Sequence, residues 1–253
     1  MSVNARRVMV LIATLASVMA TTSLGLWQLR RADFKAAMAQ QVEQRQHEQP
    51  LRNADWPCRD PGLSSQLQQR AVVLQGHWLT DKVVYLDNRQ MEGQAGFFVL
   101  TPLRLDPAPA CGPAVVLVQR GWVPRNANDR QSLKPVLTEA NRVEIRGNLL
   151  PEVSQIYALG QEPDVHKGAA SPLLRQNMSH SDWQAWLGQP LAPFALRQSD
   201  DPQAPSKELK RAWPAPDVGV GKHHAYAAQW FVMALIITGL YVWFQLIRPR
   251  RIA

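Results

Sequence analysis

An uncharged run near the C-terminus constrains this chain more than any other feature of its sequence. The 23 residues from Ala225 to Ile247 carry no formal charge, and three arginines follow within four positions. At about 1.5 Å of rise per residue, a helix of this length extends roughly 35 Å and can cross a bilayer. Aromatic residues lie near both ends, as in the interfacial belts of membrane helices. The run therefore predicts a transmembrane helix over residues 225–247.

A second apolar run lies at the N-terminus. Residues 8–26 contain no charge and follow Arg6 and Arg7. Their length of 19 residues is just enough to span a bilayer. A cleaved signal peptide is the competing interpretation, with residues 18–20 as the small-residue cleavage site. The apolar run continues past that site to Trp27, which favours an uncleaved membrane anchor over a signal peptide.

The basic residues around the two runs predict the topology. Because such residues accumulate on the cytoplasmic side, residues 1–7 and 248–253 are predicted to be cytoplasmic tails. Residues 27–224 then form an extracytoplasmic domain, periplasmic in a bacterial inner membrane. The tails hold five of the 28 Lys and Arg residues and no acidic residue, which leaves 23 basic against 20 acidic residues elsewhere. The net charge of +8 is thus mainly a topological signal, and we predict no nucleic-acid partner.

Between the two runs, the pattern changes from helix to strand. Residues 27–49 contain neither Pro nor Gly, so the first helix is expected to continue out of the membrane until Pro50. Short segments rich in Val and aromatic residues follow, with Gly, Pro and Asp between them. These predicted strands are residues 70–79, 82–89, 96–105, 114–124 and 142–150.

No helical pattern of useful length separates the five segments, so they are expected to pair antiparallel. A serine cap and Gly188 bound a short predicted helix over residues 179–188, and a further strand is expected at 193–198. The predicted fold class is an α+β membrane protein. Its two transmembrane helices flank an extramembrane domain with a mainly antiparallel β-sheet or a small barrel.

Recognisable catalytic motifs are absent from the sequence. There is no GxSxG elbow, P-loop, HExxH or dinucleotide-binding fingerprint. The two cysteines, Cys58 and Cys111, can form a disulfide in an oxidising compartment or remain free thiols in loops, and both interpretations stay open. The missing motifs favour a binding or assembly role over an enzyme.

A histidine pair, His223 and His224, lies immediately before the C-terminal run and next to Lys222. A neutral imidazole is a common metal ligand. A histidine beside a membrane is more often an ordinary interfacial residue with a hydrated ring. Residue type alone leaves both interpretations open.

Four segments are distinctive when taken together and in order. Residues 24–35 read Leu-Gly-x-Trp-Gln followed by Arg and Lys, and residues 96–103 read Gly-x-x-Val-x-Thr-Pro. Residues 116–124 contain Arg-Gly-Trp-Val-Pro, and residues 223–231 read His-x-x-Tyr-Ala-x-x-Trp across the entry to the second span. The set resembles the Surfeit-locus family of cytochrome c oxidase assembly factors. Gln119 and Lys222 depart from it, because the family often has Asn at these places.

The resemblance implies a non-enzymatic assembly factor, a chaperone of respiratory chain biogenesis that binds or delivers haem a. It implies His223 as an axial ligand of the haem iron, with Tyr226 and Trp230 stacking on the ring. Lys222 or Arg120 would then meet a propionate. The two aromatic residues also fit a simpler role as interfacial anchors.

The partners implied by the resemblance are cytochrome c oxidase subunit I, the machinery of haem a synthesis and membrane lipid. The alternative is a structural scaffold that holds oxidase subunits without binding haem. Trp27 and Gln28 are expected to pack the first span against the second, and His224 keeps the interfacial interpretation.

Overall fold

The computed structural model describes residues 3–56, 67–126, 129, 132–157, 169–200, 208–213 and 219–248. The chain divides into two compact units. The first contains Met1–Gln41 and Pro216–Ala253, and the second contains Val42–Ala215.

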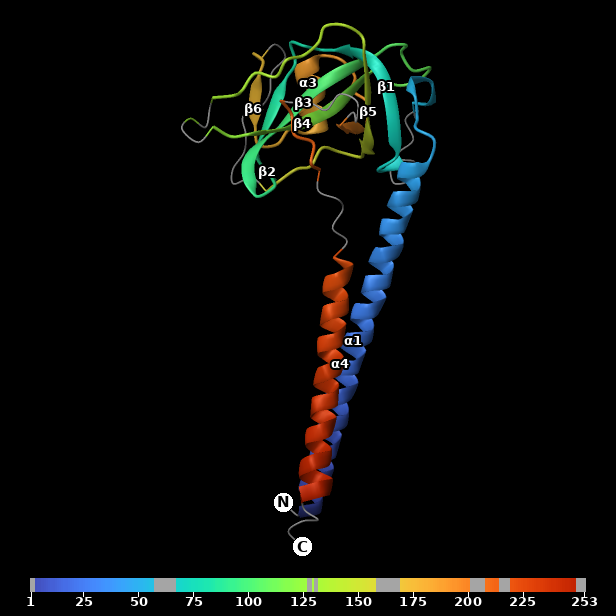
Figure 1. The fold of residues 1–253 in the computed structure, drawn as a ribbon, viewed down its shortest axis with the longest axis vertical. Coiled ribbons are helices and arrows are strands. Elements are labelled where there is room, and N and C mark those ends of the chain that lie inside the picture. Colours follow the sequence, from blue (N-terminus) through green and yellow to red (C-terminus); the bar gives the residue numbers. More distant parts are fainter. Residues whose placement is uncertain are drawn as a thin grey trace. The chain divides into compact units, whose positions relative to one another are not determined.

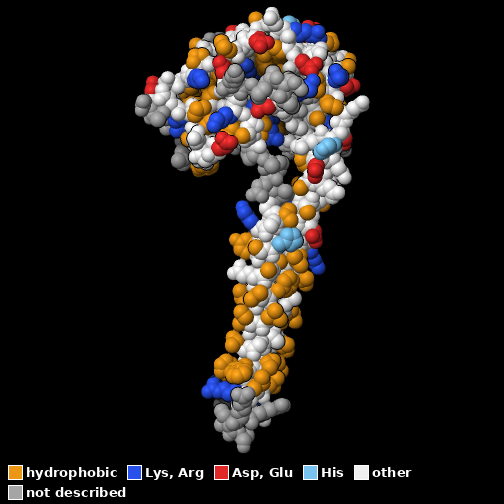
Figure 2. All heavy atoms as spheres, viewed as in Figure 1, with side chains coloured by type: hydrophobic (Ala, Val, Ile, Leu, Met, Phe, Trp, Pro, Cys, Tyr) orange, Lys and Arg blue, Asp and Glu red, His pale blue; other side chains and the backbone are white. Residues whose placement is uncertain are grey.

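Two long helices make up the first unit. They are α1 (Val3–His47) and α4 (Val220–Tyr241), and a π-helical turn, η3 (Val242–Ile247), continues α4. Figure 1 draws α1 as one unbroken helix, which confirms that helical structure extends beyond the apolar run. Both helices are long and apolar enough to cross a membrane. Hydrophobic side chains cover much of their surface on the face shown in Figure 2.

Small side chains line the contact between α1 and α4. Gly25 and Ala32 of α1 are buried, as are Ala227 and Ala234 of α4. A Cβ atom at Gly25 would lie 2.7 Å from the ring of Phe231, so this ring packs directly against the backbone of α1. Small residues at helical spacing let two membrane helices approach closely. Thr21 of α1 is buried as well, so small residues set the contact surface of the pair.

The second unit contains a β-sheet and one short α-helix. Its elements are η1 (Asn53–Asp55), β1 (Ala71–Trp78), β2 (Val84–Met91), β3 (Gln94–Leu105), β4 (Val115–Pro124), β5 (Val143–Leu150), β6 (Leu173–Arg175), α3 (His180–Leu187) and β7 (Ala195–Gln198). All six predicted strands and the predicted helix are confirmed. The three-residue β6 has no counterpart in the predictions, because a segment so short shows no periodicity.

The sheet closes into a five-stranded barrel. Its strand order is β1-β5-β7-β4-β3-β2-β6, and an additional pairing of β1 with β3 closes the ring. At this closure Gly76 lies opposite Leu105, and a Cβ at Gly76 would be 2.1 Å from the backbone oxygen of Arg104. Only glycine fits there. Two strand pairs, β4–β7 and β2–β6, are parallel and the others are antiparallel, as predicted for the sheet as a whole.

Hydrophobic side chains fill the barrel and also cover part of its outer surface. The interior cluster includes Leu74, Leu103, Val118, Leu149 and Leu196, all fully buried. The helix α3 lies beside the strands β3 and β4 (Figure 1). Its two buried tryptophans belong to a second cluster. A capping box between Ser179 and Asp182 begins α3, and left-handed Gly188 ends it, as the sequence predicts.

Cys111 is disulfide-bonded. Cys58 lies outside the described residues.

Candidate functional site

His223 lies in the first turn of α4 and faces α1. Its ring Nδ1 is 2.7 Å from Oε1 of Gln28. A carboxamide oxygen can only accept a hydrogen bond, so Nδ1 of His223 carries the proton. In the neutral ring the lone pair is then at Nε2. The contact thus selects the tautomer in which Nε2 is able to bind an electrophile or a metal.

This arrangement has the chemistry of a metal-ligating histidine. Such a histidine usually donates its second ring N–H to an oxygen atom, which orients the ring and raises its basicity. The predicted role of His223 as a ligand therefore has a partner, Gln28, that suits it. Over the described part of the chain, no group of three or more His, Cys, Asp or Glu side chains could hold a metal ion. A lone imidazole fits an iron that brings its own macrocyclic ligands, as haem does.

Tyr226 and Trp230 follow His223 at three and seven positions along α4, so the three residues share one side of the helix. Trp230 is half-buried, whereas 54% of the Tyr226 surface is exposed. Tyr226 lies at the flank of the helix contact, because the buried Ala227 occupies its centre. Neither ring stacks on another aromatic ring among the described residues.

Basic side chains of α1 surround the start of α4. Nζ of Lys35 lies 3.7 Å from the position that a Cβ would take at Gly219, the residue before α4 begins. Lys35 and Arg31 both lie within electrostatic range of His223. The predicted cation Lys222 is exposed on α4. Anionic groups of a ligand at His223 would thus meet cations from both helices.

Gln28, Arg31 and Lys35 are site residues that the sequence reasoning did not assign. All three lie in the segment 24–35 that carries the resemblance, and this was the available signal. The expectation that Gln28 contacts the second helix is confirmed, although it does so by a hydrogen bond to His223. For Trp27, 57% of the surface is exposed, and its packing against the second helix stays a prediction.

The other segments of the resemblance hold the barrel together. Trp122 is fully buried and donates a hydrogen bond from Nε1 to the backbone oxygen of Arg89 at 2.9 Å. A Cβ at Gly96 would lie 2.5 Å from the Trp122 ring, and a Cβ at Gly121 would lie 2.6 Å from Cβ of Leu209. These glycines therefore permit close packing and do not bind a ligand. Arg120 belongs to this second unit.

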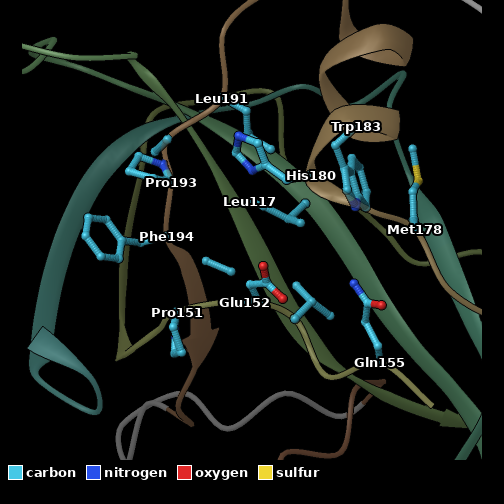
Figure 3. A pocket seen from close by; sticks show the side chains of 13 residues that line it. Leu117, Pro151, Glu152, Gln155, Met178, His180, Trp183, Leu191, Pro193 and Phe194 are labelled. Atoms are coloured by element: carbon cyan, nitrogen blue, oxygen red, sulfur yellow. The ribbon is translucent and has the colours of Figure 1, made fainter. Parts of the chain in front are cut away.

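An apolar cleft lies between α3 and the start of β7 (Figure 3). Leu191, Phe194, Met178 and Trp183 are among the residues of its apolar wall, and the ring of His180 also borders it. Its volume is about 30 Å³, close to that of a single water molecule. The cleft is therefore too small for a cofactor of the size of haem.

Comparison with known proteins gives a consistent result. The model of the SURF1 family matches residues 15–235. Surfeit locus protein 1 of Rattus norvegicus is 23% identical over 243 residues, which cover 88% of this chain and 70% of that protein. Surfeit locus protein 1 of Arabidopsis thaliana is 34% identical over 116 residues, which cover 44% of this chain and 32% of that protein.

A yeast relative is similar over a shorter stretch. The cytochrome oxidase assembly protein SHY1 of Saccharomyces cerevisiae is 28% identical over 100 residues, which cover 40% of this chain and 24% of that protein. The chain thus spans only about a quarter to a third of the plant and yeast relatives that it matches.

Proposed function

Because this chain belongs to the SURF1 family, we propose that it is a membrane-anchored assembly factor for cytochrome c oxidase that binds haem a at His223. It would deliver the haem to subunit I of the oxidase. The hydrogen bond between Gln28 and His223 is the observation that carries the haem part of the proposal. The name of the yeast relative supports the assembly part.

In this proposal, different residues of α1 and α4 orient the ligating histidine and contact the charged groups of the haem. Gln28 holds the His223 ring so that its Nε2 lone pair faces away from the hydrogen bond. Lys35 and Arg31 place positive charge near the same turn, which suits a ligand with carboxylate groups. A bound haem would supply an iron with an open axial position, an apolar macrocycle and two propionates. A single axial imidazole on a half-exposed residue favours reversible binding, as delivery to another protein requires.

The membrane placement is part of the same proposal. Both helices are long and apolar enough to span a bilayer. Arginines at the outer ends of both runs favour cytoplasmic termini, with the barrel unit in the periplasm of a cell with an inner membrane. Haem a has a large apolar face, so a site at the edge of the bilayer matches its solubility. The proposal assigns no catalytic step to the protein.

A scaffold that holds oxidase subunits without binding haem is the second candidate. The largely exposed side chains of Leu137 and Tyr157 in the second unit favour protein contacts of this kind. The two candidates differ in one measurable respect. The scaffold would co-purify with subunit I without a cofactor, whereas the haem-binding factor would carry a Soret absorption band.

Deletion of the gene tests the assembly role. We expect oxidase activity and the haem a content of subunit I to fall, while the oxidase polypeptides are still made. Restoration by the plasmid-borne gene is the control for effects on neighbouring genes. Normal oxidase activity in the deletion strain would overturn the assembly role.

An absorption spectrum tests the haem role separately. The full chain is purified in detergent from cells that make haem a, and we expect a Soret band that His223→Ala strongly reduces. His224→Ala is the matched control, because it removes the neighbouring ring and leaves the hydrogen bond to Gln28 intact. Equal Soret bands in both variants would remove His223 from the role.

A further inference from the structure

One end of the barrel contains a cavity of about 400 Å³. Trp78 and Gln198, the last residues of β1 and β7, contribute to its wall, together with Ile145 near the start of β5. Arg120 of β4 and Arg211 complete the polar side. Barrel mouths are common sites for small ligands, and pockets for such ligands have volumes of roughly 300–1,000 Å³. The cavity is therefore large enough for a small organic molecule.

A β-bulge places Arg120 at this cavity. Val99 of β3 pairs with Gly121 and the next residue, Leu100, pairs with Gln119, so Arg120 is an extra residue in β4. A bulge bends the strand and changes the direction of its side chain. The Arg120 side chain is only 7% exposed, and its guanidinium lies 4.8 Å from the centre of the Trp78 ring.

The guanidinium of Arg120 is buried without a counter-ion. It donates hydrogen bonds to neutral oxygens, namely Oγ1 of Thr101 at 3.5 Å, Oγ1 of Thr138 at 2.6 Å and the backbone oxygen of Leu137 at 3.0 Å. A guanidinium has five N–H donors, so two of them make none of these hydrogen bonds. One of the two is the N–H at Nε, which is buried without a partner. Across the residues that the structure describes, Arg120 forms no ion pair. Burial, followed by the charge of Arg211, lowers the pKa of Arg120 to about 10.

The neighbouring arginines are already neutralised. Arg211 is paired with Asp200 at 2.8 Å, and Arg146 is paired with Glu144 at 3.3 Å. The remaining carboxylate of the wall, Glu139, is exposed to solvent. Arg120 is thus a buried cation that forms no ion pair among the described residues, although Glu208 and Glu139 lie within electrostatic range. A buried charge without a hydrogen-bonded anion is costly.

We propose that the barrel mouth binds a small organic monocarboxylate, whose oxygens meet Arg120 and whose apolar body contacts Trp78 and Ile145. A carboxylate matches the planar donors of a guanidinium. A single negative charge balances the one unpaired cation. A phosphate dianion would place a second negative charge near the carboxylates of Glu139 and Glu144, which would repel it. It also has no apolar part to contact Trp78 and Ile145. This site does not depend on haem binding at His223.

Calorimetric titration of the full chain in detergent micelles tests the proposal, with benzoate as the probe. Benzamide is the matched neutral ligand and inorganic phosphate is the anion control, and titration into empty micelles corrects for partition into detergent. We expect saturable binding of one benzoate per chain, and binding at least about tenfold weaker for the two controls, because charge-assisted hydrogen bonds to Arg120 are lost or mismatched. Equal binding of benzoate and benzamide would overturn the proposal, as would no saturable binding of benzoate.

Variants locate the site. Arg120→Met keeps most of the side-chain volume, removes the charge and is expected to abolish benzoate binding. Arg104→Gln is the control, because that arginine of β3 is exposed and lies outside the cavity wall, and its benzoate affinity should match the parent chain. If Arg120→Met does not fold, Trp78→Leu takes its place and should weaken benzoate binding by about tenfold through loss of the aromatic wall. Unchanged affinity in the folded variant would overturn the assignment.

Discussion

Oε1 of Gln28 lies 2.7 Å from Nδ1 of His223, although 195 positions of sequence separate the two residues. The contact joins the segment that leaves the first apolar run to the segment that enters the second. It also selects the ring tautomer that leaves the Nε2 lone pair for a ligand. A pair of helices thereby presents one oriented imidazole.

Gln28→Leu removes this hydrogen bond and keeps the size of the side chain. We expect the affinity for haem to fall by about 10- to 100-fold, as it does when the oxygen partner of a ligating histidine is lost. The measurement is a haem titration of the apoprotein in detergent, followed by Soret absorbance. Gln40→Leu, at an exposed position of the same helix, is the control. If Gln28→Leu binds haem like the parent while His223→Ala does not, the orienting role of Gln28 is wrong.

Gly25→Leu should disturb the contact between α1 and α4. The position of a Cβ at Gly25 is 2.7 Å from the Phe231 ring, so a larger residue forces the ring away. Overpacking of this kind costs about 1–3 kcal/mol, and we expect a lower midpoint of thermal unfolding in micelles. The double variant Gly25→Leu with Phe231→Ala should recover part of the loss. A double variant less stable than either single variant would contradict the predicted coupling.

Trp122→Phe should destabilise the barrel. The change leaves the buried backbone oxygen of Arg89 without the indole N–H that it accepts at 2.9 Å. Loss of one buried hydrogen bond costs about 0.5–1.5 kcal/mol, to which the lost ring volume adds. Denaturant unfolding followed by circular dichroism measures the change. Trp27→Phe, at an exposed ring, should stay within about 0.5 kcal/mol of the parent chain.

The ionisation of Glu144 should contribute to the loss of folding stability at acidic pH. A hydrogen bond from Nε2 of Gln75 lowers the pKa of this carboxyl below its ordinary value of 4.5, and Arg146 adds to the shift. The unfolded chain then binds the proton more readily than the folded chain. The stabilisation is present above pH 4.5 and is lost as pH falls through the folded pKa.

Glu144→Gln is therefore expected to flatten the decline of the unfolding midpoint below pH 4.5. The effect should be less than about 1 kcal/mol, because the carboxylate is exposed and screened by solvent. Gln75→Leu removes the main cause of the shift and should flatten the same part of the profile. Parallel profiles for the parent chain and Glu144→Gln would rule out this contribution.

Local patterns in the sequence predicted most of the elements. Val-rich segments become β1 to β5 because alternating side chains report which face of a strand is buried. The capping box of Ser179 and Asp182 marks the start of α3, and its position needs no distant contact. The two apolar runs likewise predict α1 and α4, since a run of about 20 apolar residues can be recognised without any distant contact.

The arrangement of the strands depends on distant contacts. The strand β7 lies between β4 and β5 and runs parallel to β4, with Ala195 opposite Leu117. Nothing in four residues encodes that choice of neighbours. Closure of the barrel similarly depends on the close approach of Gly76 to Arg104. These pairings form because they bury the interior cluster from several strands at once, which is a property of the assembled sheet.

The same distinction between local pattern and distant contact applies to the two candidate sites. A histidine before the second apolar run and an arginine before Gly121 can be read directly from the sequence. The hydrogen bond between His223 and Gln28, and the position of Arg120 at a cavity without an ion pair, appear only in the folded chain. Local periodicity follows from the geometry of one backbone segment. The partner of a polar group depends instead on how small residues such as Gly25 let two helices approach, and on where a bulge turns a strand.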